Sequence, residues 1–473
     1  MRFFIDEIAR ITGGDLLVAP LNAQAEACGL TWDSRLVEPG LAYIALVGTR
    51  SDGNDFVVSA LRSGAVVALM SRTPYNEECA IAREVGAALI KVSDGEDAVR
   101  ALAAAWRNRL DAVVIGITGS VGKTTTKGLV RDVLSARFRT CATKGNYNNL
   151  LGAPYTILSA DEDCQMLVVE MGMSQSGELA RICDIARPCM GVITNIGTSH
   201  IEYLGSRENI ACAKAELVEA LPENGTAFLQ AQGEFTDFIC DHVRTADRGI
   251  RCVLFGGSAK QSDVYATDVR LDEEGRPSFM LHTAQDQAFC SLLLRGAHNV
   301  ENACAAAAVG IACGMELTEV CSALSQSAPE AGRGQLKRAS CGAAVLDDSY
   351  NASPASMKAA LATLSAYKVS GRRIAVLGDM GELGETAVLG HYETGEAVAS
   401  EGIDLLICVG KLASQIAQGA LSSGMAPDAV RCVASVQEAL DVLLPDLSKD
   451  DIVLVKASHF MGLDRVVEGV IDA

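Results

Sequence analysis

A glycine-rich loop that carries a lysine and threonines has the residue types that most clearly indicate chemistry. An apolar, β-branched run at 112–118 ends in Thr118, and the chain continues Gly119-Ser120-Val121-Gly122-Lys123-Thr124-Thr125. After a strand and before a helix, such a loop turns backbone N–H groups toward phosphates, its lysine neutralises the β and γ oxygens, and its hydroxyl binds Mg²⁺. We therefore predict an ATP site with Lys123 on phosphate and Thr124 on the metal. A strict phosphate-loop match would place glycine where Ile117 stands, so an ordinary glycine turn is the alternative.

Two further side chains follow apolar runs that are predicted to be strands of the same sheet. Glu170 ends the run 166–170, and His200 lies in the loop after the run 190–195. Because the carboxyl ends of parallel strands meet at one edge of a sheet, both are expected near the phosphate loop. Glu170 is a natural Mg²⁺ ligand. A solvent-facing glutamate and a surface histidine are the alternatives.

The elements that must position these residues alternate between strand and helix along the whole chain, which is typical of α/β folds. The first predicted domain covers residues 1–105, the second 106–325 and the third 326–473. The second domain is predicted to be a doubly wound parallel sheet around the phosphate loop, closed by an antiparallel element within 226–294. The other predicted elements are strands at 41–47, 66–70, 87–92, 343–347, 373–377, 405–409 and 452–455, and helices at 57–63, 299–313 and 319–325.

Length and charge agree with this organisation and exclude some partners. At about 150 residues per domain, 473 residues correspond to roughly three domains. A net charge of -19 repels nucleic acid and anionic lipid, so neither is an expected partner. Asp6 and Glu7 interrupt the position of a signal-peptide core, and the longest apolar run, 303–315, is too short to span a bilayer. We expect a cytoplasmic protein without membrane insertion.

Cysteine spacing gives no metal or redox motif. The 16 cysteines are scattered, without a Cys-x-x-Cys pair, and most lie in apolar runs. Buried, reduced thiols are therefore expected, and disulfides or a zinc site are the alternatives.

Taken together, the motifs resemble the Mur ligases, ATP-dependent enzymes that form the amide bonds of cell-wall peptide precursors. The resemblance covers essentially the whole chain. It is carried by Thr118-Gly119-Ser120-Val121-Gly122-Lys123-Thr124-Thr125, Thr143-Lys144-Gly145-Asn146-Tyr147-Asn148-Asn149, Glu170-Met171-Gly172, Thr194-Asn195-Ile196-Gly197-Thr198-Ser199-His200, Gly296-Ala297-His298-Asn299-Val300-Glu301-Asn302 and Gly332-Arg333-Gly334.

Other segments are similar to the MurF branch, which adds D-alanyl-D-alanine to UDP-N-acetylmuramoyl-tripeptide. They are Asp33-Ser34-Arg35 with Pro39-Gly40, Asp347-Asp348-Ser349-Tyr350-Asn351-Ala352-Ser353-Pro354 and Gly378-Asp379-Met380. The Asn-Pro-Arg motif usual in MurE-like ligases does not occur, although a ligase with a different amino-acid acceptor remains the alternative. The resemblance implies three domains: an N-terminal domain for the UDP-sugar, a central phosphate-loop domain for ATP, and a Rossmann-like C-terminal domain that closes over ATP and binds the dipeptide. It also implies Mg²⁺ as cofactor, an acyl-phosphate intermediate and a monomer.

The resemblance further assigns roles that spacing does not. Catalytic roles fall on Lys123, His200, Lys214 and Arg333, and Lys214 corresponds to a lysine that is carbamylated in many relatives. The implied metal ligands are Thr124, Glu170, His200 and carbamylated Lys214. The implied ATP contacts are the loop 118–125, Asn299, Asn302, Arg333 and Asp348. The implied UDP-sugar contacts are Ser34, Arg35, Asn146, Asn148 and Asn149, and the implied dipeptide contacts are Tyr350 and Asn351.

Alternatives remain for several of these residues. Read without the family, Lys214 would be an exposed helix residue and Asn299 a helix N-cap. At four positions the chain departs from the usual branch pattern: Asn54, Gly381, Ala457 and His459. A nucleotide-dependent switch is a different class of function, but no Asn-Lys-x-Asp base-reading motif for guanine occurs. A non-catalytic UDP-sugar binder would not need Lys123, Glu170 or His200, which are all present.

Overall fold

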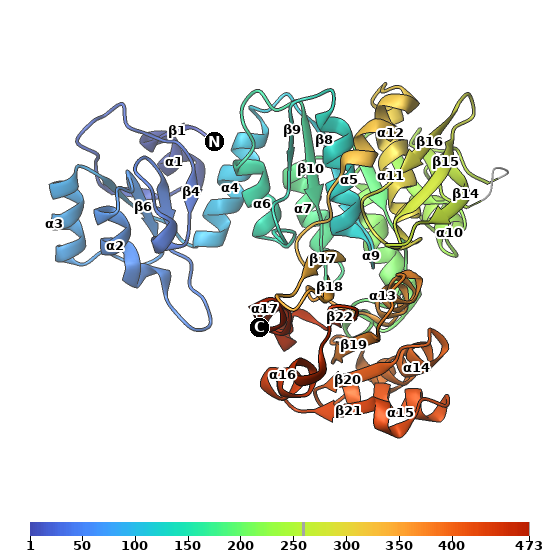
Figure 1. Ribbon diagram of the computed structural model, residues 1–473. Helices are drawn as coiled ribbons and strands as arrows, with labels where there is room; N and C mark the ends of the chain where they lie inside the picture. The colour runs from blue at the N-terminus through green and yellow to red at the C-terminus, as the bar shows by residue number, and fades with distance from the viewer. Residues whose placement is uncertain (258–260, 473) are drawn as a thin grey trace. The chain divides into compact units, whose positions relative to one another are not determined.

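The structure is a computed structural model that describes residues 1–257 and 261–472 (Figure 1). The chain forms two compact units. The first comprises Met1–Gly116, Arg139–Met171 and Ala180–Pro188, and the second comprises Ile117–Phe138, Gly172–Leu179 and Cys189–Ala473. Residues 258–260 of the expected antiparallel element and Ala473 of the expected third domain lie outside the described residues. The domain limits 1–105, 106–325 and 326–473 stay predictions.

A small α/β layer forms the N-terminal part of the first unit. Its elements are β1 (Phe3–Phe4), α1 (Ile5–Thr12), β2 (Asp15–Val18), β3 (Glu26–Ala27), β4 (Leu30–Thr31), β5 (Ala42–Ile44), α2 (Val57–Arg62), β6 (Val67–Met70), α3 (Asn76–Val85), β7 (Ala88–Lys91) and α4 (Gly95–Arg107). The sheet order is β2-β7-β6-β5-β4, parallel except for β2. β5 is shorter than predicted because the chain turns at Gly48, whose N–H binds Ser51 O, and leaves Val47 exposed.

The phosphate loop belongs to a second, larger sheet. Its elements are β8 (Val113–Thr118), α5 (Lys123–Ser135), β9 (Thr140–Ala142), α6 (Gly152–Leu158), β10 (Met166–Glu170), α7 (Glu178–Ala186), β11 (Met190–Ile193), α8 (Ile201–Leu204), α9 (Arg207–Glu219), β12 (Thr226–Gln230), α10 (Thr236–Val243) and β13 (Arg251–Phe255). The strand order is β13-β12-β11-β8-β10-β9. β8 and β10 are almost wholly buried, as expected of apolar strands covered on both faces. The chain reverses its direction of strand addition at β8, which is the topological switch point of a doubly wound sheet.

The antiparallel element predicted within 226–294 is only partly correct. β12 and β13 are parallel strands that extend the central sheet. The antiparallel sheet consists of β14 (Tyr265–Leu271), β15 (Pro277–His282) and β16 (Gln287–Ser291), with a turn at Asp272–Gly275. Short apolar runs do not reveal the partner of a strand, and therefore the parallel pairs were not separable from hairpins. The helices α11 (Asn299–Ala312) and α12 (Leu317–Gln326) follow.

The C-terminal part of the second unit is a third α/β layer. Its elements are β17 (Gln335–Arg338), β18 (Ala344–Asp347), α13 (Pro354–Ala366), β19 (Arg373–Gly378), α14 (Ala387–Ser400), β20 (Leu405–Val409), α15 (Ala413–Ser422), β21 (Val430–Val433), α16 (Val436–Leu443), β22 (Ile452–Lys456) and α17 (Asp464–Asp472). The order is β17-β18-β22-β19-β20-β21, parallel except for β17. The predicted Rossmann-like arrangement is therefore confirmed.

Alternate residues of these strands supply two separate cores. Ala375 and Leu377 of β19 pack with α13, α14 and α15, whereas Ile374 and Val376 pack with α16 and α17 (Figure 1). Side chains of a strand point alternately to its two faces, so a wholly apolar strand requires helices on both.

Two further expectations from the sequence concern the state of the cysteines and the absence of membrane-spanning helices. The described cysteines are all free, as expected, but Cys28, Cys341 and Cys432 are exposed, so the expectation of burial is wrong for them. Among residues 1–257 and 261–472, the helices are too short or too polar to cross a membrane.

Candidate active site

The phosphate loop connects β8 to α5 and depends on two glycines. Gly119 has φ +147° and Gly122 has φ +85°, conformations that side-chain-bearing residues rarely adopt. A Cβ on Gly119 would also collide with Thr194 Oγ1. Lys123, the first residue of α5, donates from Nζ to Gly119 O over 2.7 Å. The lysine thus lies over the loop at the helix N-terminus, where a phosphate would bind.

The segment after β11 supports this loop with a set of polar contacts. Thr194 Oγ1 and Asn195 Nδ2 both donate to Val121 O, over 2.6 and 2.9 Å, and Val121 N donates to Asn195 Oδ1 over 3.0 Å. Gly197 N donates to Ser120 Oγ over 2.8 Å. The loop conformation is therefore fixed by protein contacts alone.

Asn302 of α11 contacts the phosphate loop from the other side. Its Oδ1 accepts from Thr126 Oγ1 over 3.2 Å, and a Cβ on Gly122 would lie 2.7 Å from that oxygen. Asn302 Nδ2 donates to Asn299 Oδ1 over 2.9 Å, and Asn299 Nδ2 donates to Arg295 O over 2.6 Å. The N-cap of α11 is His298, so the N-cap alternative for Asn299 is wrong. The side-chain amides of Asn299 and Asn302 thus form a chain of hydrogen bonds that ends at Thr126, next to the phosphate loop.

Arg333 reaches the same loop from the segment before β17. Its Nη2 donates to Thr124 Oγ1 over 3.5 Å, and its Cζ lies 4.2 Å from the centre of the Tyr350 ring. The ring of His459 stacks on Tyr350 at 5.4 Å. The structure therefore brings Lys123, Thr124, Arg333 and Tyr350 together.

Asp348 is held by a buried lysine. Lys456 Nζ donates to Asp348 Oδ2 over 2.6 Å and to Asn351 O over 2.8 Å. Burial lowers the pKa of Lys456, and the Asp348 carboxylate opposes that shift. This pair fixes the loop that carries Tyr350 and Asn351 next to Arg333.

His200 lies beside a carboxylate that spacing did not single out. Its Nδ1 is 2.6 Å from Glu382 Oε2, and the side chain of His200 is 21% exposed, so the ring is partly buried and paired with a carboxylate. The His200 ring and Lys123 both lower the pKa of Glu382, against the effect of burial.

Lys214 of α9 is buried, so the exposed-residue alternative for it is also wrong. Burial lowers the pKa of Lys214 well below its ordinary value, and the nearby charge of Lys123 lowers it further. Both effects favour the neutral form of the amine.

Glu170 belongs to the first unit, where it ends β10. It is buried, which excludes a solvent-facing role, and its Oε1 accepts from Asn148 Nδ2 over 2.8 Å. Its backbone N donates to Thr143 Oγ1 over 2.9 Å. Asn149 Oδ1 accepts from Gly152 N over 2.8 Å at the start of α6.

An aromatic cluster in the first unit joins the two predicted UDP-sugar segments. Trp32, which precedes Asp33-Ser34-Arg35, contacts Tyr155 at 4.8 Å and Tyr147 at 6.2 Å between ring centres. Tyr147 lies between Asn146 and Asn148 in sequence. Arg35 is paired with Asp33, and its hydrogen bonds lower the pKa of that carboxyl to about 2. The structure therefore brings the 33–35 and 146–149 segments close together.

Three departures from the branch pattern have identifiable surroundings in the structure. Asn54 is buried and hydrogen-bonds Asp52 and Ser71, so it supports the loop. Ala457 is fully buried against Gly378, where a Cβ would lie 2.7 Å away, so that glycine makes room for the alanine. Gly381 N donates to Ser458 Oγ over 2.9 Å, and a Cβ there would lie 2.9 Å from the exposed Phe460 ring.

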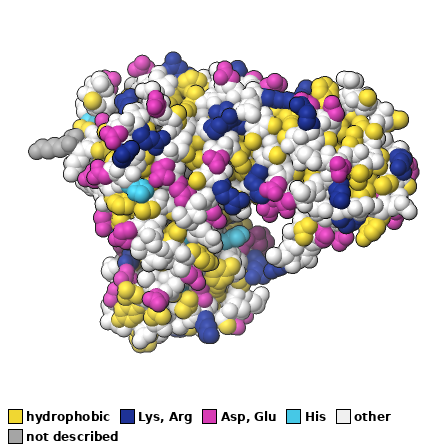
Figure 2. Space-filling view, turned by 180° about the vertical axis from the view of Figure 1, so that it is seen from behind, with side chains coloured by type: hydrophobic (Ala, Val, Ile, Leu, Met, Phe, Trp, Pro, Cys, Tyr) yellow, Lys and Arg dark blue, Asp and Glu magenta, His cyan; other side chains and the backbone are white. Residues whose placement is uncertain are grey.

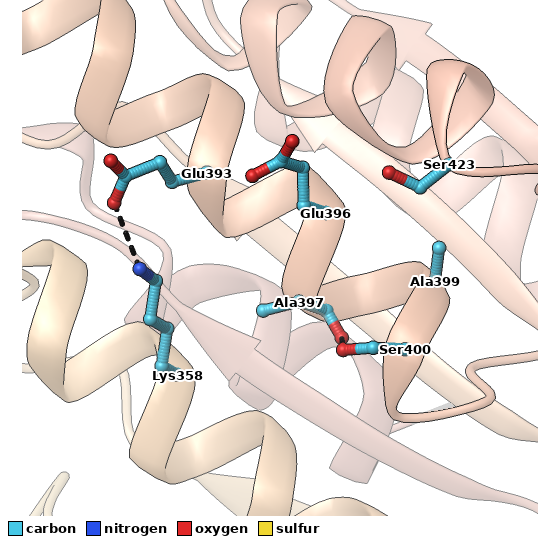
Figure 3. A pocket seen from close by; sticks show the side chains of 7 residues that line it. All are labelled: Lys358, Glu393, Glu396, Ala397, Ala399, Ser400 and Ser423. Atoms are coloured by element: carbon cyan, nitrogen blue, oxygen red, sulfur yellow. Dashed lines mark hydrogen bonds and ion pairs between the residues drawn. The ribbon is translucent and has the colours of Figure 1, made fainter.

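A pocket of about 450 Å³ lies away from these residues, among α13, α14 and the end of α15 (Figure 3). The ion pair between Lys358 and Glu393 crosses its lining. The other lining residues are Glu396, Ala397, Ala399, Ser400 and Ser423. None of them is a predicted site residue.

On the side of the molecule that Figure 2 shows, acidic and basic side chains are interspersed.

The chemistry of the site fits a nucleotide and a hard cation. Within the described part of the chain, the buried atoms Thr118 Oγ1 and Arg333 Nε have no hydrogen-bond partner, and both belong to the residues around the phosphate loop. No group of three or more His, Cys, Asp or Glu side chains forms a ready metal site among residues 1–257 and 261–472. Mg²⁺ commonly uses one or two carboxylates together with substrate phosphates, so it does not require such a group.

Three family models match successive parts of this chain. Residues 26–107 match the family described as Mur ligase family, catalytic domain, residues 117–310 the Mur ligase middle domain, and residues 332–459 the Mur ligase, glutamate ligase domain. The UDP-N-acetylmuramoyl-tripeptide–D-alanyl-D-alanine ligase of Bacillus subtilis is 35% identical over 99% of this chain and 98% of its own length.

Solved structures agree. A crystal structure of MurF from Acinetobacter baumannii has a TM-score of 0.85 at 30% identity, covering 100% of this chain and 99% of that one. MurF ligase from Thermotoga maritima, in complex with ADP, has a TM-score of 0.76 at 27% identity, covering 94% and 97%. With matches along its full length in sequence and in fold, the chain belongs to the Mur ligase family.

Proposed function

We propose that this chain is the ATP-dependent ligase that joins D-alanyl-D-alanine to UDP-N-acetylmuramoyl-tripeptide. The observation that carries the proposal is the near-full-length identity to the Bacillus subtilis ligase of that name. The arrangement of Lys123, Thr124 and Arg333 around the phosphate loop supports it. We expect the ligase to work in the cytoplasm.

In the proposed reaction, the terminal carboxylate of the tripeptide attacks the γ-phosphorus of ATP, which gives an acyl phosphate and ADP. Two anions must approach each other, so cations must offset the charge of the transition state. Lys123 at the N-terminus of α5 and Arg333 beside Thr124 supply that charge. The amine of D-alanyl-D-alanine then attacks the acyl carbon, and phosphate leaves.

The residues that would hold Mg²⁺ are Thr124, Glu170, His200 and Lys214. Bound there, the ion would neutralise phosphate oxygens. Burial of Lys214, which lowers its pKa and favours the neutral amine, supports carbamylation, because only a neutral amine adds to CO₂, and the product is an anion. Glu382 would orient His200 from the C-terminal layer.

The sugar nucleotide is proposed to bind in the first unit. Ser34 and Arg35 on one segment and Asn146, Asn148 and Asn149 on the other provide donors for phosphate and sugar oxygens. The aromatic cluster of Trp32, Tyr147 and Tyr155 supports the closeness of these segments.

ATP and the dipeptide are proposed to meet in the second unit. The loop 118–125, Asn299, Asn302, Arg333 and Asp348 would contact ATP, and Tyr350 and Asn351 would contact the dipeptide. Asn302 would also act through the loop, since its amide already binds Thr126. The three domains are proposed to cover 1–105, 106–325 and 326–473, and the chain to act as a monomer.

The test is phosphate release from MgATP with UDP-N-acetylmuramoyl-tripeptide, with and without D-alanyl-D-alanine, while mass spectrometry follows the pentapeptide. Release that needs both substrates and yields pentapeptide is expected. Release with another acceptor, such as a single amino acid, would contradict the dipeptide assignment but keep the ligase chemistry. Release that ignores both substrates would indicate a nucleotide switch instead.

A further inference from the structure

One face of the helix after the phosphate loop carries three cations. Lys123, Lys127 and Arg131 of α5 are spaced four residues apart, so they follow one another along the same face. Lys123 faces the loop, whereas the side chain of Lys127 is only 1% exposed. Burying a lysine is costly unless an anion accompanies it.

Glu330 provides that anion from the segment between α12 and β17. Its Oε1 accepts from Lys127 Nζ over 3.3 Å and from Arg131 Nη1 over 2.9 Å. The carboxylate approaches the helix at Gly128, where a Cβ would lie 2.9 Å from Oε1. A side chain at position 128 would therefore push Glu330 away from both cations.

Glu330 also begins the turn that presents Arg333. Arg333 N donates to Glu330 O over 3.1 Å, and Gln335 Nε2 donates to Pro329 O over 3.3 Å. Gly332 at φ +64° and Gly334 at φ +69° flank Arg333. At the other end of this turn, the guanidinium of Arg333 contacts Thr124 and the Tyr350 ring.

We infer that Glu330 is a positioning residue of the ligase: its two ion pairs fasten the 330–333 turn to the phosphate-loop helix and so fix the guanidinium of Arg333 over the phosphates. The inference rests on the proposed function. A flexible arginine stabilises transition-state charge well only when its place is set before the reaction, because misplacement by about 1 Å can cost roughly a hundredfold in rate. Glu330 acts through Arg333, since its carboxylate is committed to two cations of α5.

A double-mutant cycle separates positioning from a merely structural role. The variants are Glu330→Gln, which keeps the shape and removes the charge, Arg333→Ala, and the two together. Glu330→Gln is expected to lower kcat about tenfold or more in the parent, with KM for ATP changed less. In the Arg333→Ala background the same change is expected to lower kcat less than about twofold. Equal losses in both backgrounds, or no loss in the parent, would overturn the inference.

Two further variants serve as controls. Glu273→Gln removes a carboxylate from an exposed ion pair with Lys368 and is expected to leave kcat unchanged. Arg131→Gln removes the half-exposed cation and keeps the buried Lys127 pair, so it tests the inference if Glu330→Gln does not fold. It is expected to lower kcat in the parent and not in the Arg333→Ala background. A loss that is independent of Arg333 would contradict positioning.

A measurement of nucleotide binding distinguishes a failure of the inference about Glu330 from a failure of the proposed function. The affinity of each variant for a fluorescent ATP analogue is measured with Mg²⁺ and no other substrate. If the parent binds the analogue but forms no pentapeptide, the proposed function fails, and the inference about Glu330, which rests on it, fails with it. If the parent forms pentapeptide and the cycle is additive, only the role of Glu330 fails.

Discussion

Lys123 is the side chain on which the proposed phosphoryl chemistry depends most directly. Lys123→Ala removes the cation over the phosphate loop and is expected to lower kcat at least about a hundredfold, because a single charge-stabilising donor has an effect of that size. Affinity for UDP-N-acetylmuramoyl-tripeptide should be unchanged, since its proposed contacts lie in the first unit. Phosphate release measures the first quantity and calorimetry the second.

A matched control is Lys368→Ala, which removes an exposed lysine paired with Glu273. It is expected to turn over at the parent rate. Turnover of Lys123→Ala within about twofold of the parent would refute the assigned ATP site, whereas lost sugar-nucleotide binding would show that the variant has disturbed more than the loop.

The sequence identifies single site residues better than it identifies the distant residues that contact them. Lys123 and Thr124 were identifiable because the loop is contiguous and its physical role fixes the spacing. Asn302 and Glu382 contact Thr126 and His200, and Glu330 contacts Lys127, from more than 170 positions away in sequence. Nothing local marks such pairs, because only the packing of α11 and of the C-terminal layer brings them together.

Asp451, just before β22, is hydrogen-bonded to Arg372, just before β19, and so holds the starts of the two strands together. Its Oδ1 accepts from Arg372 N and its Oδ2 from Arg372 Nη2, both over 2.8 Å, and Ser448 N donates to Oδ2 over 3.0 Å. Burial alone would raise the pKa of Asp451, but these hydrogen bonds hold it below its usual value. A depressed folded-state pKa means that the carboxylate stabilises the fold above the unfolded pKa of about 4 and loses this effect as pH falls through the folded value.

Asp451→Asn is therefore expected to lower the free energy of unfolding by about 2 kcal/mol at pH 7. The difference from the parent should shrink as the pH falls below about 4, because the parent carboxylate becomes protonated. Urea denaturation of both proteins across this pH range measures it. Asp428→Asn, at an exposed carboxylate, is the control. A difference that is equal at pH 7 and pH 3 would contradict the assigned role of charge.

Elements were predictable where one strand has both faces buried. β10 and β20 have the predicted limits, because a polar residue, Gln165 or Asp404, precedes each apolar run and Glu170 or Gly410 marks its end. β9 and β21 were not predicted: they are three- and four-residue edge strands whose residues are mostly half-buried or exposed. β12 and β13 fall within 226–294, which was predicted only as an antiparallel element, and their parallel pairing depends on α10, which connects them.

For the whole molecule, similarity along 99% of the chain adds what local patterns do not. Charge and length exclude partners and set a domain number, but they do not distinguish one acceptor from another. The departures at Gly381, Ala457 and His459 all lie in the C-terminal layer, and two of them have close neighbours there: Gly378 lies beside Ala457, and the Phe460 ring lies beside Gly381.

The positions of the two tryptophans give this protein a built-in optical signal. Trp106 is buried, with Nε1 donating to Ala160 O over 3.0 Å, whereas Trp32 is half-buried at the edges of Tyr147 and Tyr155. Both belong to the first unit, so tryptophan emission originates there. Addition of UDP-N-acetylmuramoyl-tripeptide is expected to change the emission of Trp32 while Trp106 gives a constant background.

Trp32→Phe should abolish this response and keep the emission of Trp106. A response that persists in Trp32→Phe would show that the sugar nucleotide is sensed elsewhere. In the parent protein, the wavelength and intensity of tryptophan emission would thus report binding of UDP-N-acetylmuramoyl-tripeptide without a label.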